Sequence, residues 1–280
     1  MFCFIKEALK DIAVQAKEVG IMELTHYDSY NVQVFKDTRK RSLGEYADDT
    51  KVLIKNTKVY EDLSGVSIEE PVKQEISFTY AKTTEEGLVG AEEGMKTAVL
   101  NFADALIPGG LVLEGADTQE ECLCRCSNLY ESLTAEQCIQ GYYGINAKYG
   151  KGDYTDRLIY SPDVLFFKDD EYWLINEPKK ISVITTPFPV VDCASEEIYK
   201  RRIECILKVA ASNSVKYLVL GAIGTGAFGN PVEAVARAFA EVLSERRYVE
   251  NIVFAIPKLS GVDTTHGVFK ETFYKYYKEV

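Results

Sequence analysis

The chain has 280 residues, of which 46% are hydrophobic and 27% are charged, a composition typical of a globular protein with a sizeable buried core. A formal net charge of −11 and a pI near 4.9 argue against a general affinity for nucleic acid or for anionic membranes. No apolar run approaches the ~18 to 20 residues that span a bilayer, so no membrane helix is expected.

The predicted elements change in character along the chain. The N-terminal half is irregular, with a predicted helix at residues 3–20, a more polar helix at 37–55, a strand at 76–81, a buried strand at 98–103, a helix after residue 121 and a Tyr- and Gly-rich loop at 141–154. Residues 23–35 fit no single pattern. The C-terminal half is regular, with two short strands at 157–170, a buried strand at 181–189, a helix at 196–211, a strand at 215–223, a helix at 231–245, a strand at 251–257 and an aromatic-rich helix at 267–277. This alternation predicts a layered α/β sheet, with a helical extension at residues 1–65 packed on it.

A glycine-rich loop follows the predicted strand at 215–223. Its sequence GAIGTGAFGNP (221–231) contains a literal G-x-G-x-x-G between a strand and a helix, which is the context of a dinucleotide-binding fingerprint. The loop comes late in the chain, however, and the next strand ends in Pro257-Lys258 without the acidic residue that would bind a ribose hydroxyl. A phosphate site at the helix N-terminus, with Asn230 as the N-cap, is therefore favoured over a nicotinamide dehydrogenase or a plain tight turn.

The segment from Asn101 to Arg125 contains the residues best suited to catalysis. Its buried strand leads to a turn at Pro108-Gly109-Gly110, and Gln119-Glu120-Glu121 follows a few residues later. Glycines let a backbone close on a ligand, and carboxylates just beyond such a loop are placed for proton chemistry. Adjacent glutamates alone usually mark a solvated helix start, so the interpretation depends on this context.

Other reactive side chains are given structural roles. On a helix Cys124 faces away from Cys122 and Cys126, so one zinc site is disfavoured and buried or half-buried thiols are expected. His26 and His266 lie in no nucleophile or metal motif, which leaves little support for a Ser/His or Cys/His hydrolase. Seven irregularly spaced cysteines and an N-terminus without signal-peptide features predict a reduced, cytoplasmic protein.

Three segments, in order, are similar to the bacterial-type poly(ADP-ribose) glycohydrolase family, a branch of the macrodomain fold. The segment 101–121 resembles the family's strand, triple-glycine loop and Gln-Glu-Glu signature. IYSPDVLFF with ISVITTPFP forms the second match, and 221–231 resembles the diphosphate-binding loop. TRKRSLGEYADDT (38–50) matches the family's helical extension. The resemblance implies a macrodomain-like three-layer α/β/α mixed sheet, with a catalytic core at residues 66–280 after the extension at 1–65.

The resemblance also implies roles for individual residues. Glu121 would protonate the departing ribose oxygen and then activate water as a carboxylate, while Glu120 would hold the ribose across that bond. Gln119 would brace the loop. The other implied ligand-binding positions are Asn101, Ala103, Asp104, Gly109, Gly110 and the diphosphate loop Gly224, Thr225, Gly226, Ala227, Phe228 and Gly229, with Phe228 packing on the ribose. Glycoside cleavage needs an acid at the leaving group and nearby negative charge, and no metal or other cofactor is required.

Two positions depart from the family pattern. Leu111 stands where the third glycine is expected, so a bulky side chain narrows the site or shifts the choice of substrate. Asp104 stands where a small or amide residue is common, and its carboxylate either repels a phosphate or binds a ribose hydroxyl. Tyr142 and Tyr143 are candidates for lining an adenosine pocket, although packing in the core is the simpler interpretation.

The sequence therefore predicts an enzyme that cleaves ADP-ribosyl O-glycosidic (ribose–ribose) bonds and releases ADP-ribose. Two alternatives remain: a non-catalytic ADP-ribose-binding macrodomain, which Leu111 favours, and a hydrolase of a different ADP-ribosylated target. The presence of all of Gln119-Glu120-Glu121 favours the enzyme. The expected partner is ADP-ribose or an ADP-ribosylated macromolecule, and the oligomeric state is left open.

Overall fold

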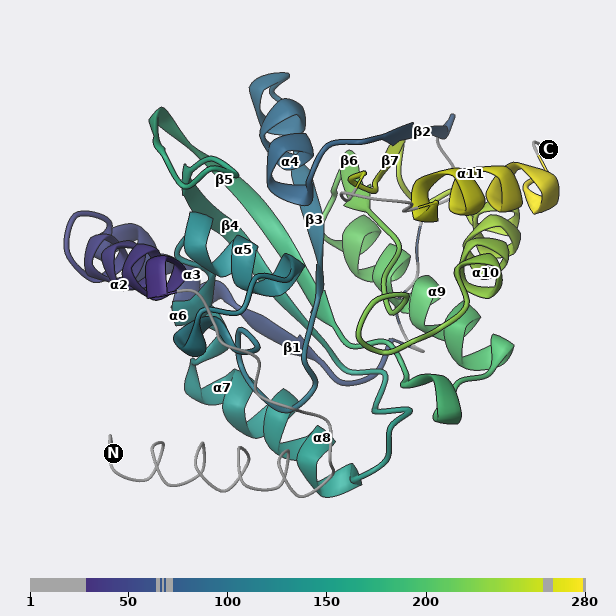
Figure 1. Cartoon of the computed structure of the whole chain (residues 1–280), viewed down its shortest axis with the longest axis horizontal. Coiled ribbons are helices and arrows are strands. Elements are labelled where there is room, and N and C mark those ends of the chain that lie inside the picture. Colours follow the sequence, from purple (N-terminus) through teal and green to yellow (C-terminus); the bar gives the residue numbers. More distant parts are fainter. Residues whose placement is uncertain (1–28, 64–65, 67, 69–72, 259–263, 279–280) are drawn as a thin grey trace.

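The fold is built on one mixed β-sheet. The computed structural model describes residues 29–63, 66, 68, 73–258 and 264–278. Its strands are β1 (Lys58–Tyr60), β2 (Glu75–Thr79), β3 (Thr97–Phe102), β4 (Leu158–Lys168), β5 (Leu174–Thr186), β6 (Tyr217–Leu220) and β7 (Asn251–Ala255). They form a sheet in the order β1-β4-β5-β3-β6-β7-β2 (Figure 1). β4 runs antiparallel to both of its neighbours, and all other neighbouring strands pair in parallel.

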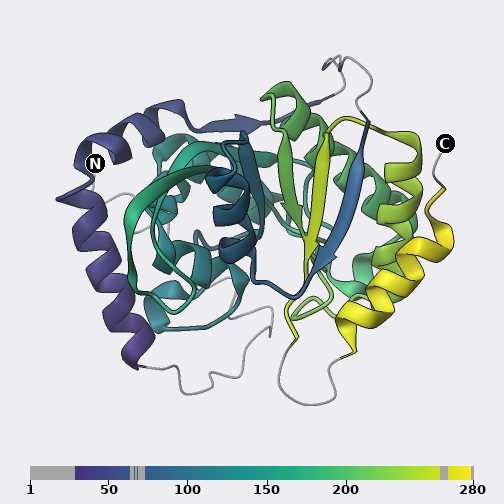
Figure 2. The same ribbon diagram turned by 90° about the horizontal axis from the view of Figure 1, so that it is seen from above.

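Helices cover both faces of this sheet (Figure 2). They are α2 (Ser29–Leu43), α3 (Ala47–Asn56), α4 (Thr83–Glu92), α5 (Gln119–Cys126), α6 (Leu129–Leu133), α7 (Glu136–Cys138), α8 (Gly144–Tyr149), α9 (Glu196–Ser212), α10 (Val232–Glu245) and α11 (Thr265–Tyr276). Because side chains alternate along a strand, Leu100 and Leu218 pack with α9, α10 and α11, whereas Val99 and Val219 pack with helices from α2 to α7. The predicted three-layer α/β/α arrangement is therefore confirmed.

Most elements of the C-terminal half lie where the apolar pattern predicts them. β6, β7, α9, α10 and α11 match the predicted strands and helices to within a few residues, and β2 and β3 do the same in the N-terminal half. β5 begins earlier than predicted, at Leu174. Its first seven residues (LINEPKK) are exposed or half-buried and mostly not apolar, whereas its last six are buried. Only the second half therefore gives an apolar run.

The two short strands predicted around Ser161-Pro162 are a single strand, β4. Its pairing register with β5 shifts between Ser161 and Val164, which places Pro162 and Asp163 in a bulge. Asp163 has φ of 53°, and a proline lacks the N–H that a regular ladder needs. A bulge accommodates both residues without ending the strand, so the prediction of a break was wrong.

The prediction of a loop at 141–154 is wrong for residues 141–149, which are helical. A π-helical turn (Ile139–Tyr143) leads directly into α8, and Gly150 ends that helix in the left-handed conformation. Tyr142 and Tyr143 are fully buried and belong to the same hydrophobic core as α5 and α6. Burial of two aromatic side chains stabilises this helical segment despite its glycines.

The polar helix predicted at 37–55 is two helices, α2 and α3, separated by a turn at Gly44. Glycine is a poor helix former, so the break falls there. Thr50 Oγ1 donates to Ser42 O across the turn (2.9 Å), which fixes α3 against the end of α2. The segment is helical as predicted, but it is not one continuous helix.

The N-terminal part contributes a strand as well as helices. α2 begins inside the stretch at 23–35 that fits no pattern, and the helix predicted at 3–20 lies outside the described residues. β1, which also precedes residue 65, joins the sheet by pairing with β4. The division of the chain at residue 65 stays a prediction, and we propose that α2 and α3 form the helical extension within the described part.

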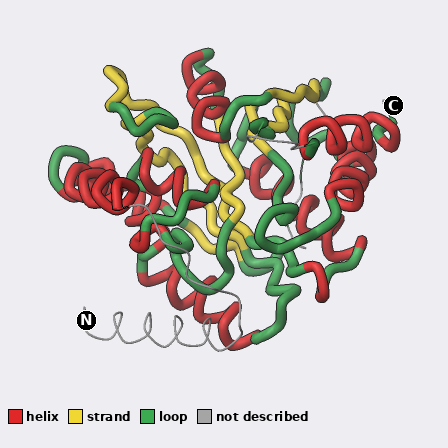
Figure 3. The backbone as a smooth tube through the Cα atoms, viewed as in Figure 1, coloured by secondary structure: helices red, strands yellow, loops and turns green. Residues whose placement is uncertain are grey.

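The loops that follow β3 and β6 leave the same edge of the sheet (Figure 3). β3 and β6 are parallel neighbours, and the chain leads away from them in opposite directions, from β3 towards β4 and β5 and from β6 towards β7. A crevice at such a reversal of strand order is the usual ligand site of open α/β sheets. The Gln-Glu-Glu segment follows β3, and the glycine-rich loop follows β6, so the topology brings both motifs to this edge.

Candidate active site

The three residues Gln119, Glu120 and Glu121 form the first turn of α5 and do not precede it. The helix begins there because Thr118 and Glu121 make a capping box, in which each side chain satisfies the other's backbone N–H. Both carboxylates therefore lie at a helix N-terminus, where the helix dipole favours negative charge. The printed sequence contains this signal as T-x-x-E, and the sequence interpretation did not use it.

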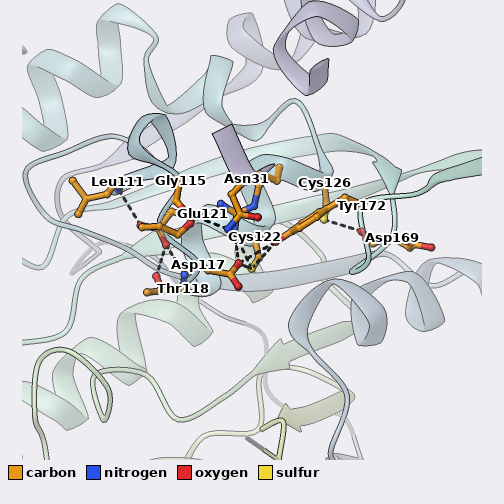
Figure 4. A network of polar contacts seen from close by, with 12 residues as sticks. Asn31, Leu111, Gly115, Asp117, Thr118, Glu121, Cys122, Cys126, Asp169 and Tyr172 are labelled. Carbon is orange, nitrogen blue, oxygen red and sulfur yellow. Dashed lines mark hydrogen bonds and ion pairs between the residues drawn. The ribbon is translucent and has the colours of Figure 1, made fainter. Parts of the chain in front are cut away.

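Glu121 is buried, with 4% of its surface exposed, and its carboxylate accepts three hydrogen bonds (Figure 4). The backbone N–H of Leu111 donates to Oε1 (2.9 Å), and the N–H of Thr118 donates to Oε2 (3.1 Å). The Thr118 hydroxyl donates to Oε2 as well. These donors lie at the two ends of the segment 111–118, so the carboxylate is fixed in one orientation.

Glu120 is buried still more deeply, at 2% exposure. Asn101 Nδ2 donates to its Oε1 (3.2 Å), and the backbone N–H of Asp104 donates to Oε2 (2.8 Å). Burial raises the pKa of Glu120 well above its ordinary value, and the neighbouring Glu121 carboxylate raises it further. The adjacent pair therefore contains one carboxyl group that resists ionisation.

The raised pKa of Glu120 predicts a pH-dependent stability. The folded chain holds this proton at a pH where the unfolded chain, with a pKa near 4.5, has lost it, so the group reduces stability as the pH rises above about 4.5. Glu120→Gln removes the ionisation and hence this slope, which is at most about 1.4 kcal/mol per pH unit. Thermal denaturation at a series of pH values above about 4.5 should show the Tm of the variant rising relative to the Tm of the wild type as the pH increases. A difference in Tm that is the same at every pH would contradict the assignment.

The side chain of Gln119 ties the start of α5 to the end of β3. Its Nε2 donates to Leu100 O (2.7 Å) and to Thr83 Oγ1 (3.1 Å), and its Oε1 accepts from the backbone N–H of Phe102 (2.9 Å). An amide suits this position because it both donates and accepts. The bonds hold the first turn of α5 beside the strand that carries Asn101.

Gly109 and Gly110 both lie in the left-handed region, with φ of 70° and 57°. A Cβ at Gly110 would overlap Glu121 Oε1 and would lie 3.2 Å from Glu120 Oε2. Glycine is therefore required there both by the backbone and by the approach to the two carboxylates. Leu111 has φ of −100°, which any residue adopts, and in Figure 4 its side chain extends away from Glu121. The backbone conformation at position 111 therefore does not require a glycine.

The Asp104 side chain stabilises the turn after β3. Its Oδ1 accepts from the backbone N–H groups of Leu106 (2.7 Å) and Ile107 (2.8 Å). Burial raises the pKa of Asp104, because the two backbone donors offset only part of the desolvation. The carboxylate thus has a structural task in the loop. Ala103, beside it, is buried, and its N–H donates to Thr186 O (3.3 Å).

The loop after β6 is open towards solvent. Gly224 and Gly229 take left-handed conformations, with φ of 78° and 71°, and Gly226 and Ala227 are exposed. No described residue accepts a hydrogen bond from the N–H of Gly226, Ala227 or Phe228. Successive unpaired N–H groups in a glycine loop ahead of a helix form a concavity that suits an anion.

Asn230 does not cap α10, and the N-cap prediction was wrong. The N-cap position belongs to Pro231, whereas the Asn230 amide donates to Pro189 O (2.8 Å) and Gly224 O (2.9 Å). Its Oδ1 accepts from the Tyr199 hydroxyl (2.6 Å). The side chain therefore anchors the glycine loop to α9 and to the segment after β5, which the sequence interpretation missed.

An aromatic pair lies at the glycine loop after β6. The rings of Tyr154 and Phe228 lie 6.1 Å apart, and Tyr154 is nearly fully buried with φ of 52°. Burial raises the pKa of Tyr154 to about 12, and the carboxylate of Asp104 adds to that shift. Tyr154 thus packs beside the loop after β6, and no sequence pattern pointed to it.

The three cysteines of α5 and His266 pack against neighbouring side chains. Cys124 and Cys126 are buried and Cys122 is half-buried, as expected from the sequence, and burial raises the pKa of all three. The His266 ring stacks on Tyr80 at 3.9 Å, while His26 lies outside the described residues. Within the described ranges no group of three or more His, Cys, Asp or Glu side chains is arranged to hold a metal ion.

A mixed sheet with helices on both faces, a buried carboxylate pair after one central strand and an open glycine loop after its neighbour define a macrodomain-like α/β enzyme. The family profile described as microbial-type PARG, catalytic domain, matches residues 28–169. The poly(ADP-ribose) glycohydrolase of Deinococcus radiodurans in complex with ADP-ribose is 31% identical over 81% of this chain and 97% of its own, with a TM-score of 0.74. The Thermomonospora curvata enzyme is 28% identical over 88% of this chain and 100% of its own, with a TM-score of 0.77.

The chain belongs to the microbial-type poly(ADP-ribose) glycohydrolase family. A structure of the Thermomonospora curvata enzyme bound to the inhibitor ADP-HPD is also similar, at 27% identity and a TM-score of 0.77. A search of curated proteins gave no match. The family resemblance, the fold class and the enzyme class predicted from the sequence are confirmed by these comparisons.

Proposed function

We propose that this chain hydrolyses the ribose–ribose O-glycosidic bond of poly(ADP-ribose) and releases ADP-ribose. The observation that supports this most strongly is the buried pair Glu120 and Glu121 at the start of α5, beside a loop whose Gly110 leaves no room for a side chain. The open N–H groups of Gly226 and Phe228 at the same edge of the sheet suit the diphosphate of the ligand. Complexes of the Deinococcus radiodurans relative with ADP-ribose favour the same ligand here.

Glu121 is the proposed acid and base. Its carboxylate is fixed by donors on both sides, at a helix N-terminus, which suits the form that activates water. The first step requires this group in its protonated form. Glu121 then donates its proton to the departing ribose oxygen as the C–O bond breaks, and takes a proton from the water that attacks the sugar carbon. The charge of Glu120 or its hydrogen bond to a hydroxyl would hold that sugar in place.

The diphosphate role of the glycine loop predicts a specific loss of binding. Gly224→Ala places a Cβ 2.8 Å from Asn230 Nδ2 and from Phe188 Cβ, at a φ of 78°. We expect the affinity for free ADP-ribose to fall by about tenfold or more, because the new Cβ displaces the loop and its N–H groups lose their alignment. Isothermal titration with free ADP-ribose measures this affinity.

Gly267→Ala is the matched control for that change, because a Cβ there meets no atom within 4 Å. The control should bind ADP-ribose as the wild type does. Unchanged affinity in folded Gly224→Ala would remove the loop from the binding site.

The rival proposal is a reader that binds ADP-ribose without cleaving it. Its sequence support was Leu111, but this residue has an ordinary backbone conformation and still donates its N–H to Glu121. A bulky residue at this position therefore leaves the catalytic carboxylate in place. A hydrolase of a different ADP-ribosylated target is the second alternative, and it shares the same carboxylates.

Release of ADP-ribose from an automodified poly(ADP-ribose) polymerase tests the proposal. The wild-type chain should convert the polymer to free ADP-ribose, detected by chromatography. Polymer that is bound but not cleaved would establish the reader. Cleavage of a singly modified protein, with the polymer left intact, would establish the different target.

The remaining expectations concern the cellular setting. No described helix combines the length and the apolar character needed to cross a bilayer. We propose a cytoplasmic enzyme that acts on ADP-ribosylated macromolecules without a metal, a general affinity for nucleic acid or a membrane partner. Its acidic net charge of −11 supports the last two points.

A further inference from the structure

A fully buried arginine reaches back from the last turn of α5 to the segment that precedes this helix. Arg125 is 0% exposed, and its Nη1 and Nη2 groups donate to Ala116 O and to Asp117 Oδ1. Its guanidinium lies 5.0 Å over the ring of Tyr172, whose hydroxyl donates to the same Asp117 oxygen (3.1 Å). A buried guanidinium is costly unless it is hydrogen-bonded. Here Nη1 and Nη2 both bond to the loop before α5, whereas the buried Nε has no partner among the described residues.

A second anchor comes from the N-terminal extension. Asn31, on α2, is 6% exposed, and its Nδ2 donates to Gly115 O (3.1 Å) (Figure 4). Thr38, about two turns further along the same face of α2, donates from Oγ1 to Arg125 O (2.6 Å). Each of the three successive residues 115–117 is therefore held by a side chain from elsewhere. Gly115 itself has φ of 87°, so the turn is a sharp one.

This held segment leads directly to Thr118, which supplies two of the three donors on Glu121. A displacement of residues 115–117 would move the Thr118 N–H and hydroxyl, and Glu121 would lose its orientation. We infer that Arg125 and Asn31 are positioning residues for Glu121, which act through the turn at 115–117 and touch neither substrate nor the reacting atoms. The inference rests on the proposed function for its kinetic test, but not for its structural one.

The kinetic test compares three variants of the full chain. Arg125→Met keeps the length of the side chain and removes its donors, Arg125→Lys keeps one charged donor, and Asn31→Ala removes the second anchor. Arg39→Met is the control, because Arg39 Nε pairs with Glu131 Oε1 (2.7 Å) and makes no hydrogen bond to the turn at 115–117. We expect kcat for ADP-ribose release to fall about 100-fold in Arg125→Met, with KM and ADP-ribose affinity unchanged and partial recovery in Arg125→Lys.

The structural test follows amide hydrogen exchange in the peptide 111–121. The N–H groups of Leu111 and Thr118 should exchange faster in Arg125→Met and in Asn31→Ala, while the strands of the central sheet keep wild-type protection. If Arg125→Met does not fold, Asn31→Ala alone provides both measurements. Wild-type kcat and wild-type exchange in the folded variants would overturn the inference, as would an equal loss in Arg39→Met. A wild type that releases no ADP-ribose would refute the proposed function, while the exchange rates still decide the role of Arg125.

Discussion

Glu121→Gln is expected to reduce ADP-ribose release by about 10²- to 10⁴-fold, the range typical of a lost general acid and base. Glutamine preserves the size of the side chain and keeps an oxygen that accepts from the Leu111 N–H. It removes the proton that would go to the departing ribose oxygen. The affinity for free ADP-ribose should stay within about twofold, because glutamine still fits the buried space beside the loop.

Steady-state release and isothermal titration on the same preparation separate chemistry from binding. Glu114→Gln provides the matched control, because Glu114 is an exposed glutamate on the same loop. It should release ADP-ribose at the wild-type rate. Full activity in Glu121→Gln would show that the mechanism proposed for this carboxylate is wrong, and a parallel loss of binding would assign it to substrate recognition.

Gly110→Ala is expected to have an effect of similar size for a different reason. The new Cβ would overlap Glu121 Oε1 and would lie 3.2 Å from Glu120 Oε2, at a φ of 57°. Both carboxylates must move to admit it, and a displacement of about 1 Å at a reacting group costs about 100-fold in rate. We expect kcat to fall by at least that factor, while ADP-ribose affinity changes less.

Gly94→Ala separates backbone strain from the clash with the carboxylates. Gly94 also has a left-handed conformation, with φ of 73°, but a Cβ there meets no atom within 4 Å. Both variants should lose roughly 1–2 kcal/mol of stability from the backbone alone, measured as a lower Tm. Only Gly110→Ala should lose activity, and equal rates in the two variants would refute the requirement for space at Gly110.

The layered sheet could be predicted because the sequence patterns of its strands and helices are local. Strands that are apolar over their whole length alternate with amphipathic helices, and each pattern covers a few consecutive residues. The errors came where a local signal was overridden by packing. Tyr142 and Tyr143 were expected to pack in the core, and they do, but the adjacent glycines led to a loop prediction where the chain is helical. Pro162 looked like a break, and a bulge absorbs it.

The same contrast holds for the candidate site. Gly110, Glu120 and Glu121 lie within one short segment, so their motif was visible in the sequence. Asn31 and Gly115 are separated by 84 positions, and no pattern in either segment indicates that they meet. Asn230 was assigned to the wrong task because it precedes a helix. Its real partners, at Tyr199 and Pro189, come from distant segments.

A crystal structure of this chain with ADP-ribose tests the central claim most directly, because the claim joins two loops into one site. We expect the diphosphate on the N–H groups of Gly226, Ala227 and Phe228, and the terminal ribose within about 3 Å of the Glu121 carboxylate. A ligand bound away from either loop, or a ribose that does not reach Glu121, would contradict the proposed function.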